Sequence, residues 1–237
     1  HLNIDTGNSS GDTLNIRDTG ESANGQIGWL TDSTFRGLGI ASNKTLTYEN
    51  SEQVNVQLGT GSDTLNVQGT HASSVTTVTG NTGNDIVNLH DTEGRLENLD
   101  GNLTINLGAN GSDTLNIIDT GEQVEGQEGW LTGTTFRGFG TGEAAPGVHP
   151  TRAITYGTVD ILNINLGNRA DTLNVRSTHS TTTNINTNGG TDIVKVQSTT
   201  DGGPFSVNTG PANDQVHIYD PAAATFPELV DKRGNLD

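Results

Sequence analysis

The chain of 237 residues contains no cysteine and no methionine. Small secreted domains that cannot build a large core depend on several disulfides, so the missing cysteines exclude that class of scaffold. A composition without oxidisable sulfur also suits a protein outside the cell. We therefore expect an extracellular or cell-surface location.

Basic residues and long apolar runs are scarce as well. The 11 Lys and Arg residues stand against 28 Asp and Glu residues, which gives a formal net charge of -17. Nucleic-acid readers carry a basic footprint, so this balance argues against DNA or RNA as a partner. No apolar run approaches the roughly 18 residues of a membrane-spanning helix, and we predict no transmembrane segment. Because the chain begins at His1, we interpret it as a fragment of a longer protein.

The apolar content is low, at 30% hydrophobic and 4% aromatic residues, so any core must be thin. Val, Ile, Leu and Thr alternate with Asn, Asp, Gln and Ser, which is typical of strands with one buried face. We expect Leu65 and Val67 to point inward and Asn66 to point outward. Asn residues at the strand centres are predicted to stack as ladders, as amides do in stacked strands.

A long repeat organises the chain. Residues 12–36 return almost unchanged at 113–137, so that Trp29 matches Trp130 and Arg36 matches Arg137. Within it lies a shorter repeat of a strand, a Gly/Asn turn, an Asp and a second strand. The turn aspartates of this shorter repeat are Asp12, Asp63, Asp85, Asp113, Asp171, Asp192 and Asp214. Several neighbours are about 21–22 residues apart, a spacing in the range of solenoid repeats.

These periods predict an all-β fold, a parallel β-solenoid (β-helix) of roughly 22-residue coils. We expect one continuous solenoid over residues 1–220, with repeat units of about 1–102 and 103–204 and a partial third at 205–220. Residues 221–237 are expected to form a C-terminal cap or linker. The Trp-bearing segments are predicted to form further coils or a side loop, with Trp29 and Trp130 on the same side of the rod or related by a small rotation.

Three turns suggest a metal site. The sequence GTGSDTLNV at 59–67 resembles the RTX-type, haemolysin-like calcium-binding nonapeptide, as do the turns at 80–88 and 108–116. The resemblance implies Ca²⁺ bound by turn carbonyls and Asp carboxylates, since this hard ion prefers six to eight oxygens. The residues that match the pattern, and our candidate metal ligands, are Gly59, Gly61, Asp63, Gly83, Asp85, Gly111 and Asp113. The alternative is structural, with each Asp accepting backbone N–H bonds in an Asx-turn.

The aromatic residues leave two alternatives open. Trp29, Trp130, Phe35 and Phe136 could form a platform on which glycans stack, or they could fill a small core. A β-helical polysaccharide lyase would need a basic residue in one groove, and Arg36 and Arg137 return in both units. Thr-rich runs are similar to the flat arrays of ice-binding solenoids but do not recur on every coil. We therefore assign no catalytic residues and expect a protein that is not an enzyme.

The Asp-Thr-Leu-Asn units resemble the tandem β-solenoid repeats of large secreted bacterial surface proteins. The resemblance implies a structural or adhesive segment of an extracellular rod, stalk or fibre. The alternative is a surface module that binds calcium or glycans, while a lyase-like enzyme or an ice-binding protein is less favoured. The expected partners are other copies through the solenoid ends, or neighbouring repeats of a longer chain.

Overall fold

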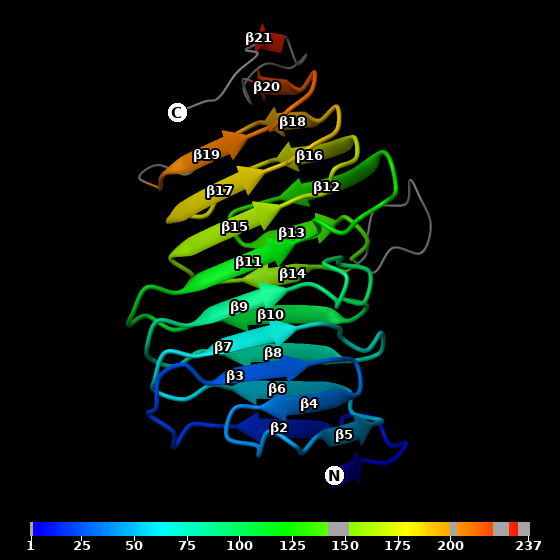
Figure 1. Ribbon diagram of the computed structural model, residues 1–237, viewed down its shortest axis with the longest axis vertical. Coiled ribbons are helices and arrows are strands. Elements are labelled where there is room, and N and C mark those ends of the chain that lie inside the picture. The colour runs from blue at the N-terminus through cyan, green and yellow to red at the C-terminus, as the bar shows by residue number, and fades with distance from the viewer. Residues whose placement is uncertain (1, 142–151, 200–202, 220–227, 232–237) are drawn as a thin grey trace.

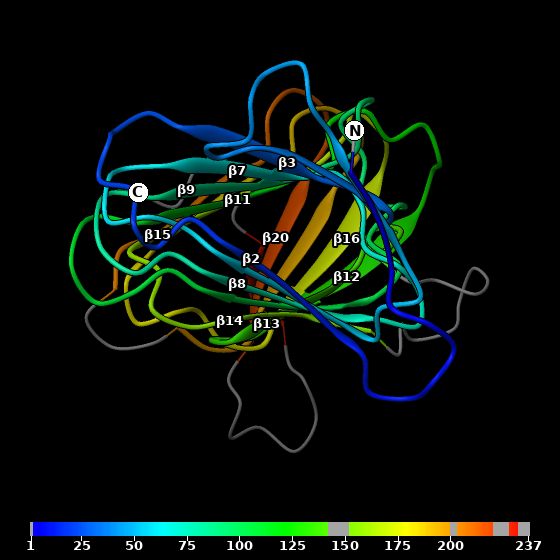
Figure 2. The ribbon, with the colours of Figure 1, turned by 90° about the horizontal axis from the view of Figure 1, so that it is seen from below.

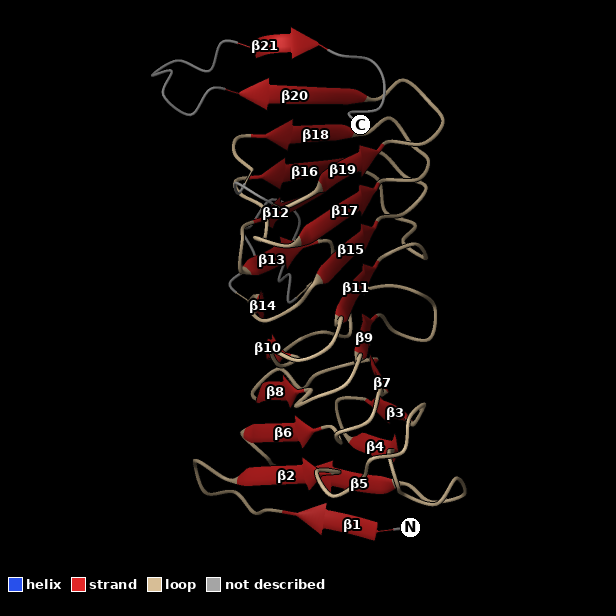
Figure 3. Ribbon diagram, turned by 90° about the vertical axis from the view of Figure 1, so that its left-hand side faces the viewer, coloured by secondary structure: helices blue, strands red, loops and turns tan. Residues whose placement is uncertain are grey.

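The structure is a computed structural model that describes residues 2–141, 152–199, 203–219 and 228–231. These residues form strands, turns and loops without any helix (Figure 3). The strands stack along one long axis, from the N-terminal end at the bottom of Figure 1 towards the C-terminal end at the top.

Two sheets run the length of this stack. Sheet A has ten strands in the order β1-β5-β4-β3-β7-β9-β11-β15-β17-β19. Their bounds are β1 Leu2–Asp5, β5 Leu46–Glu49, β4 Thr34–Gly37, β3 Ile27–Leu30, β7 Thr64–Val67, β9 Ile86–Leu89, β11 Thr114–Ile118, β15 Ile161–Asn165, β17 Thr182–Asn186 and β19 Phe205–Asn208.

Sheet B has eleven strands in the order β2-β6-β8-β10-β14-β13-β12-β16-β18-β20-β21. Their bounds are β2 Thr13–Arg17, β6 Gln53–Gln57, β8 Val75–Thr79, β10 Asn102–Asn106, β14 Ile154–Tyr156, β13 Thr135–Gly138, β12 Gln127–Leu131, β16 Asp171–Val175, β18 Ile193–Val196, β20 Gln215–Tyr219 and β21 Glu228–Asp231. Seen along the axis, the two sheets enclose the core, and the loops gather at their edges (Figure 2).

The chain winds between the sheets as a parallel solenoid, which confirms the predicted fold class. β7 pairs in parallel with β9 in the register Leu65↔Val87, and β18 pairs in parallel with β20 in the register Val194↔Val216. Each of these steps adds one coil of 22 residues, and the hydrogen bond from Asn88 to Asn66 spans the same separation. The predicted coil length is therefore correct where no extra segment intervenes.

The Trp-bearing segments depart from the coil pattern and from our expectation. Each folds into a three-stranded antiparallel meander inside a sheet: β3-β4-β5 in the first unit and β12-β13-β14 in the second. In both meanders the chain steps back along the axis, so that β5 pairs with β1 and β14 pairs with β10. The segments are thus neither additional coils nor side loops.

The two meanders lie in opposite sheets. β3 with Trp29 belongs to sheet A, and its equivalent β12 with Trp130 belongs to sheet B. The same exchange applies to β2 and β11, because one repeat unit contains an odd number of crossings between the sheets. The prediction that both tryptophans lie on one side was therefore wrong. The shared sequence determines the local fold of each meander, while the number of crossings decides the sheet.

The core is a thin double layer of aliphatic side chains. Leu65 and Val67 of β7 are fully buried, as predicted, and Val87 and Leu89 stack on them from β9. Burying one such side chain contributes about 1.5–3 kcal/mol relative to leaving it exposed. Phe35 and its equivalent Phe136 are also fully buried, so each meander supplies an aromatic ring to the same core.

Asparagine side chains connect the coils on the outer face of sheet A. Asn88 donates from its amide to Asn66 at 3.0 Å, and Asn116 donates to Asn88 at 2.8 Å. The line continues through Asn163 and Asn184, at 2.8 and 2.9 Å. These bonds confirm the predicted ladders for Asn66, Asn88 and Asn116. In sheet B, Asn15 accepts from Asn55, whereas Asn174 donates to Glu128 and to the Gly129 carbonyl.

The two ends of the solenoid differ. At the N-terminal end, an open pocket of about 480 Å³ is lined largely by apolar side chains of the first coil, including Leu2, Leu14 and Phe35. At the other end, β21 pairs antiparallel with β20. Of the predicted C-terminal segment, residues 221–237, the remaining positions lie outside the described residues.

Candidate functional site

The turn aspartates form a continuous ladder at the start of the sheet A strands. The backbone N–H of Asp63 donates to the Asp85 carboxylate at 2.9 Å, and that of Asp85 donates to Asp113 at 2.8 Å. The N–H of Asp113 in turn donates to Asp160. We call these four residues the turn ladder. The carboxylates of Asp85, Asp113 and Asp160 therefore connect one coil to the next, while that of Asp63 accepts the Gly59 N–H of its own turn.

A shorter ladder of the same kind lies at the start of the sheet B strands. The Asp171 N–H donates to Asp192 at 2.9 Å, and the Asp192 N–H donates to Asp214 at 3.0 Å. At the first coil of this sheet, Asp12 donates its N–H to Glu52. The Asp that recurs before the second strand of each repeat therefore makes a hydrogen bond between neighbouring coils.

Three of the four carboxylates in the turn ladder are buried, and each of the three has a hydrogen-bond partner on only one oxygen. Asp63 is 2% exposed, and Asp85 and Asp113 are fully buried. In each, one carboxylate oxygen accepts a backbone N–H, while the other (Oδ1 of Asp63, Oδ2 of Asp85 and Asp113) has no hydrogen-bond partner. Burial, followed by the charges of Asp113 and Asp63, raises the pKa of Asp85 to about 7. A proton or a cation at these oxygens would relieve the desolvation penalty.

The glycines of the predicted metal site are required by backbone packing. Gly83 and Gly111 have φ of 120° and 130°, in the left-handed region that favours glycine. A Cβ on Gly83 would lie 2.3 Å from the Gly61 carbonyl oxygen, and one on Gly111 would lie 1.7 Å from that of Gly83. The glycines thus stack one coil above another. Gly59 donates its N–H to Asp63 at 3.2 Å.

The candidate ligands are therefore arranged as a line along the axis. In the ranges that the structure describes, no three His, Cys, Asp or Glu side chains surround one point in the manner of a metal site. Burial and unpartnered oxygens still fit the chemistry of a hard cation such as Ca²⁺, which binds carboxylate and carbonyl oxygen. Calcium at these turns stays a prediction.

The structure adds acidic residues that the sequence pattern did not indicate. Asp18 and Glu21, at the end of β2, lie beside Asp63, whose charge helps to raise the pKa of Asp18 after burial. Glu21 accepts the backbone N–H groups of Ser22 and Ala23, both at 2.8 Å. We call Asp18, Glu21 and Asp63 the first acidic corner.

The second unit repeats this arrangement with Asp119, Glu122 and Asp171, which we call the second acidic corner. Glu122 accepts the N–H groups of Gln123 and Val124, as Glu21 does at the equivalent turn. The signal in the sequence is the motif Asp-Thr-Gly-Glu, which occurs at 18–21 and again at 119–122. The motif itself contains only two acids. The sequence does not indicate that a third acid, Asp63 or Asp171, packs beside them from the next coil.

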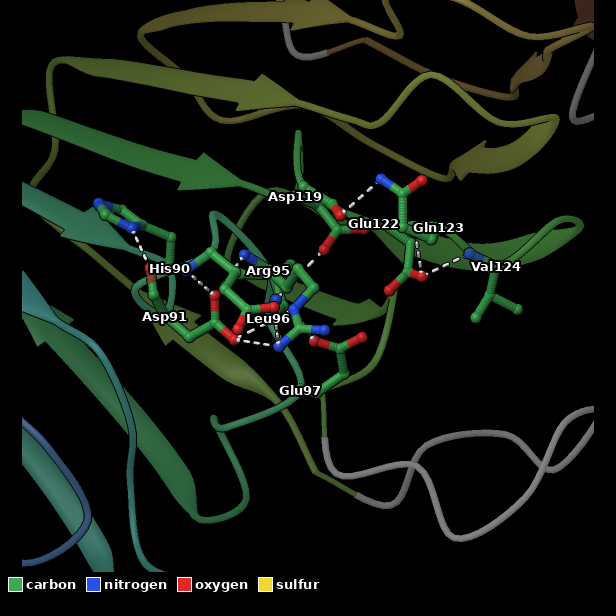
Figure 4. Close-up of polar contacts among 11 residues, drawn as sticks. His90, Asp91, Arg95, Leu96, Glu97, Asp119, Glu122, Gln123 and Val124 are labelled. Carbon is green, nitrogen blue, oxygen red and sulfur yellow. Dashed lines mark hydrogen bonds and ion pairs between the residues drawn. The ribbon is translucent and has the colours of Figure 1, made fainter.

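A loop of residues 90–100 covers the second acidic corner. Leu96 donates its N–H to Asp119 at 3.2 Å, and Glu97 shares a side-chain hydrogen bond with Glu122. Figure 4 shows Glu97 reaching from this loop towards Asp119 and Glu122, which come from the turn after β11. Arg95 of the same loop forms ion pairs with Asp91, Glu93 and Glu97, at 3.1, 2.8 and 3.2 Å respectively.

Burial and mutual repulsion set the electrostatics of this corner. Burial, and then the charges of Glu122, Glu97 and Asp171, raise the pKa of Asp119 to about 9. Burial and the contact with Glu122 raise the pKa of Glu97 to about 7. Burial also acts to raise the pKa of Glu122, but the hydrogen bonds from Glu97 and from the two backbone N–H groups hold it below its usual value. The Glu97–Glu122 pair therefore shares one proton more readily than it carries two charges.

The aromatic residues divide between core and surface. Phe35 and Phe136 fill the core, as one alternative proposed, but Trp29 is only partly buried. The guanidinium of Arg36 lies over the Trp29 ring, 3.9 Å from its centroid, in a cation–π contact. Trp130 is likewise partly buried and pairs in register with Asn174 on sheet B. The expectation of core packing is therefore correct for the phenylalanines and wrong for the tryptophans.

The sequence of the chain matches no protein-family model and no curated protein. The described residues include no helix long and apolar enough to cross a membrane.

Proposed function

We propose that this chain is a non-enzymatic structural or adhesive segment of an extracellular repeat protein, part of a rod, stalk or fibre. The observation that carries the proposal is the set of inter-coil ladders. Backbone pairing runs along the axis through all the described coils, and the line of asparagines and the turn ladder add side-chain bonds between coils of sheet A. Such a stack resists bending because each unit contacts the next over its whole cross-section.

The acidic surface supports the same role. A formal net charge of -17 keeps such a rod soluble and makes parallel rods repel one another. It fits an extracellular or cell-surface location, where divalent cations are abundant enough to screen the charge. No catalytic arrangement is proposed.

The open first coil supports association with another repeat. In the repeat, β1 and β2 are equivalent to β10 and β11. The strands β10 and β11 pair with β8 and β9 of the preceding coil, whereas β1 and β2 are edge strands beside the apolar pocket at Leu2. Leu2 is 60% exposed. We propose that a coil equivalent to β8 and β9, from a neighbouring repeat or a second copy, covers this end.

A tandem chain tests the rod. Residues 1–203 fused to the N-terminus of a second, full-length copy would join the units in register, because residue 204 corresponds to residue 1 in the repeat. Electron microscopy should show one straight rod, longer by about 4.8 Å for each added coil. Two compact bodies joined by a flexible link would overturn the proposal. Surface labelling of intact source cells with an antibody tests the location.

The second candidate is a surface module that binds calcium, and it is favoured by the unpartnered buried oxygens of Asp63, Asp85 and Asp113. Millimolar Ca²⁺ should then raise the melting temperature, and Asp85→Asn should reduce the rise. Mg²⁺ is the control, since it demands a tighter octahedral shell. A glycan-binding module is a further alternative, because Trp29 and Trp130 are only partly buried. Binding of the chain to a glycan array tests it.

A further inference from the structure

The second acidic corner brings together acids from three segments of the chain. Glu97 comes from the loop after β9, Asp119 and Glu122 come from the turn after β11, and Asp171 begins β16. Asp119 feels the charges of all three other residues, so the four carboxylates form one electrostatic group. None of these four residues belongs to the calcium-like turns at 59–67, 80–88 and 108–116.

Three of these carboxylates are buried. Asp119 is 1% exposed, Glu122 is 3% exposed and Asp171 is 4% exposed. Oδ2 of Asp119 and Oδ1 of Asp171 have no hydrogen-bond partner, and the Glu122 side chain shares its hydrogen bond with another acid, Glu97. A buried carboxylate oxygen without a donor costs free energy that a bound cation would recover.

The opposite oxygens are anchored. Oδ1 of Asp119 accepts the Leu96 N–H, and Oε1 of Glu122 accepts two N–H groups from its own turn. Backbone donors therefore hold both side chains in position through one oxygen and leave the other oxygen free of backbone contacts. These two ligands are already held in place, while Glu97 has to move to complete the set.

Local positive charge is insufficient to neutralise the group. The positive charge of Arg95 is shared by three ion pairs, with Asp91, Glu93 and Glu97. Arg169 pairs with Glu125 at 3.3 Å. Against these two guanidinium groups stand the four carboxylates of the group and the three acids that the arginines also contact.

We propose that Asp119, Glu122 and Asp171, closed by Glu97, form a binding site for a hard divalent cation, with Ca²⁺ the best match. The donors are all oxygen, whereas Zn²⁺ and other softer ions select imidazole or thiolate. Because no three acidic side chains in the described parts of the chain yet surround one point, binding draws Glu97 away from Arg95. The Glu97 side chain is 38% exposed, so it can turn towards the ion without displacing the core.

The first acidic corner provides a matched control inside the same molecule. Asp18 and Glu21 have the same local motif and the same backbone cap, but both are partly exposed. The closing residue Glu97 belongs to the second corner, where it contacts Glu122. We therefore expect a weaker site, or none, at the first corner.

Calorimetric titration of the full chain with Ca²⁺, after removal of metal by chelation, tests the site. Glu97→Gln and Asp119→Asn should each weaken Ca²⁺ binding at least about tenfold, a change of about 1.4 kcal/mol. The matched variants Glu21→Gln and Asp18→Asn should change it less than about threefold, as expected for two acids that are only partly buried. Circular dichroism checks folding, and if Asp119→Asn does not fold, Glu97→Gln decides, since it lies on a partly exposed loop.

Two results would overturn the proposal. One is Ca²⁺ binding that is absent, or is unchanged in Glu97→Gln; protons alone would then relieve the burial. The other is binding that Asp85→Asn abolishes while Glu97→Gln leaves it intact, which would place the ion in the turn ladder. The proposed cation site and the proposed rod function are tested separately. Titration measures Ca²⁺ binding, and microscopy of the tandem chain measures its shape.

Discussion

The two acidic corners have the same local sequence but different surroundings. In the first, Asp18 and Glu21 are partly exposed; in the second, Asp119 and Glu122 are almost fully buried. The difference comes from the loop of residues 90–100, which contributes the Leu96 N–H and the Glu97 carboxylate to the second corner. A repeated motif therefore acquires its chemistry from the coil packed against it.

The largest expected effect is on pH dependence. The pKa values of Asp85 and Asp171 are raised to about 7, and that of Asp119 to about 9. The folded chain thus holds protons that the unfolded chain releases above about pH 4. The stabilisation is complete below that pH and is lost as the pH rises through 7 and then 9. In chelator, the free energy of unfolding should fall by at least about 4 kcal/mol between pH 4 and pH 9, which is what the raised pKa of Asp85 alone corresponds to at about 1.4 kcal/mol per pKa unit.

Urea denaturation at a series of pH values measures this fall. Asp119→Asn should flatten the part between pH 7 and pH 9, because Asn keeps an acceptor for Leu96 without a charge. Asp18→Asn should leave that part unchanged. Equal curves for both variants would mean that the two corners do not differ in burial.

The second effect concerns a glycine in each meander. A Cβ on Gly129 would lie 2.0 Å from the Phe139 ring, whereas one on Gly28 would lie 2.8 Å from the end of the Leu38 side chain. Gly129→Ala should destabilise the fold by about 3 kcal/mol and Gly28→Ala by about 1 kcal/mol, because the ring has less room to move. Midpoints of chemical denaturation give the comparison. A larger loss at Gly28 would contradict it.

The sequence predicted features that depend on alternation and missed those that depend on pairing partners. Leu65 and Val67 face the core and Asn66 faces outward, because a strand places successive side chains on opposite faces. The same alternation fits a parallel coil and an antiparallel meander equally well. The fold of the Trp segment, and hence the exchange of sheets between Trp29 and Trp130, was therefore not predictable from the pattern.

The candidate site was predictable only in part. The sequence identified Asp63, Asp85 and Asp113 because they recur before strands. Nothing in the pattern joins Asp119 to Glu97, since the contact is set by how the loop after β9 packs on the next coil. The motif Asp-Thr-Gly-Glu was visible twice, but burial, which distinguishes its copies, is a tertiary property.

A third prediction addresses the asparagine ladder. Asn116 donates to Asn88 and accepts from Asn163, while Asn174 donates to Glu128 and Gly129. Asn116→Ala interrupts the ladder on both sides and should cost about 2 kcal/mol, since it removes two bonds that contribute about 1 kcal/mol each. Asn174→Ala, on sheet B, should cost about half as much because its bond to the Glu128 side chain is exposed to solvent. Thermal melts of both variants decide, and equal losses would show that continuity along the ladder adds nothing.

The smallest effect is expected at the surface of the first meander. Arg36→Ala removes the cation–π contact with Trp29 and should cost about 0.5–1 kcal/mol. The emission of Trp29 should shift as its environment changes. Arg36→Lys, which keeps the charge but loses the planar group, serves as the control. A spectrum unchanged in Arg36→Ala would mean that the arginine does not cover the ring in solution.

The odd number of crossings in each unit has a geometric consequence. Successive units are related by a half-turn combined with an advance along the axis, which is the operation of a twofold screw. A longer array built on this rule would show a Trp–Arg pair on alternating sides and would repeat only after two units. The two opposite faces of such a rod are equivalent. Partners would bind both faces through identical contacts, at positions offset along the axis by the length of one unit.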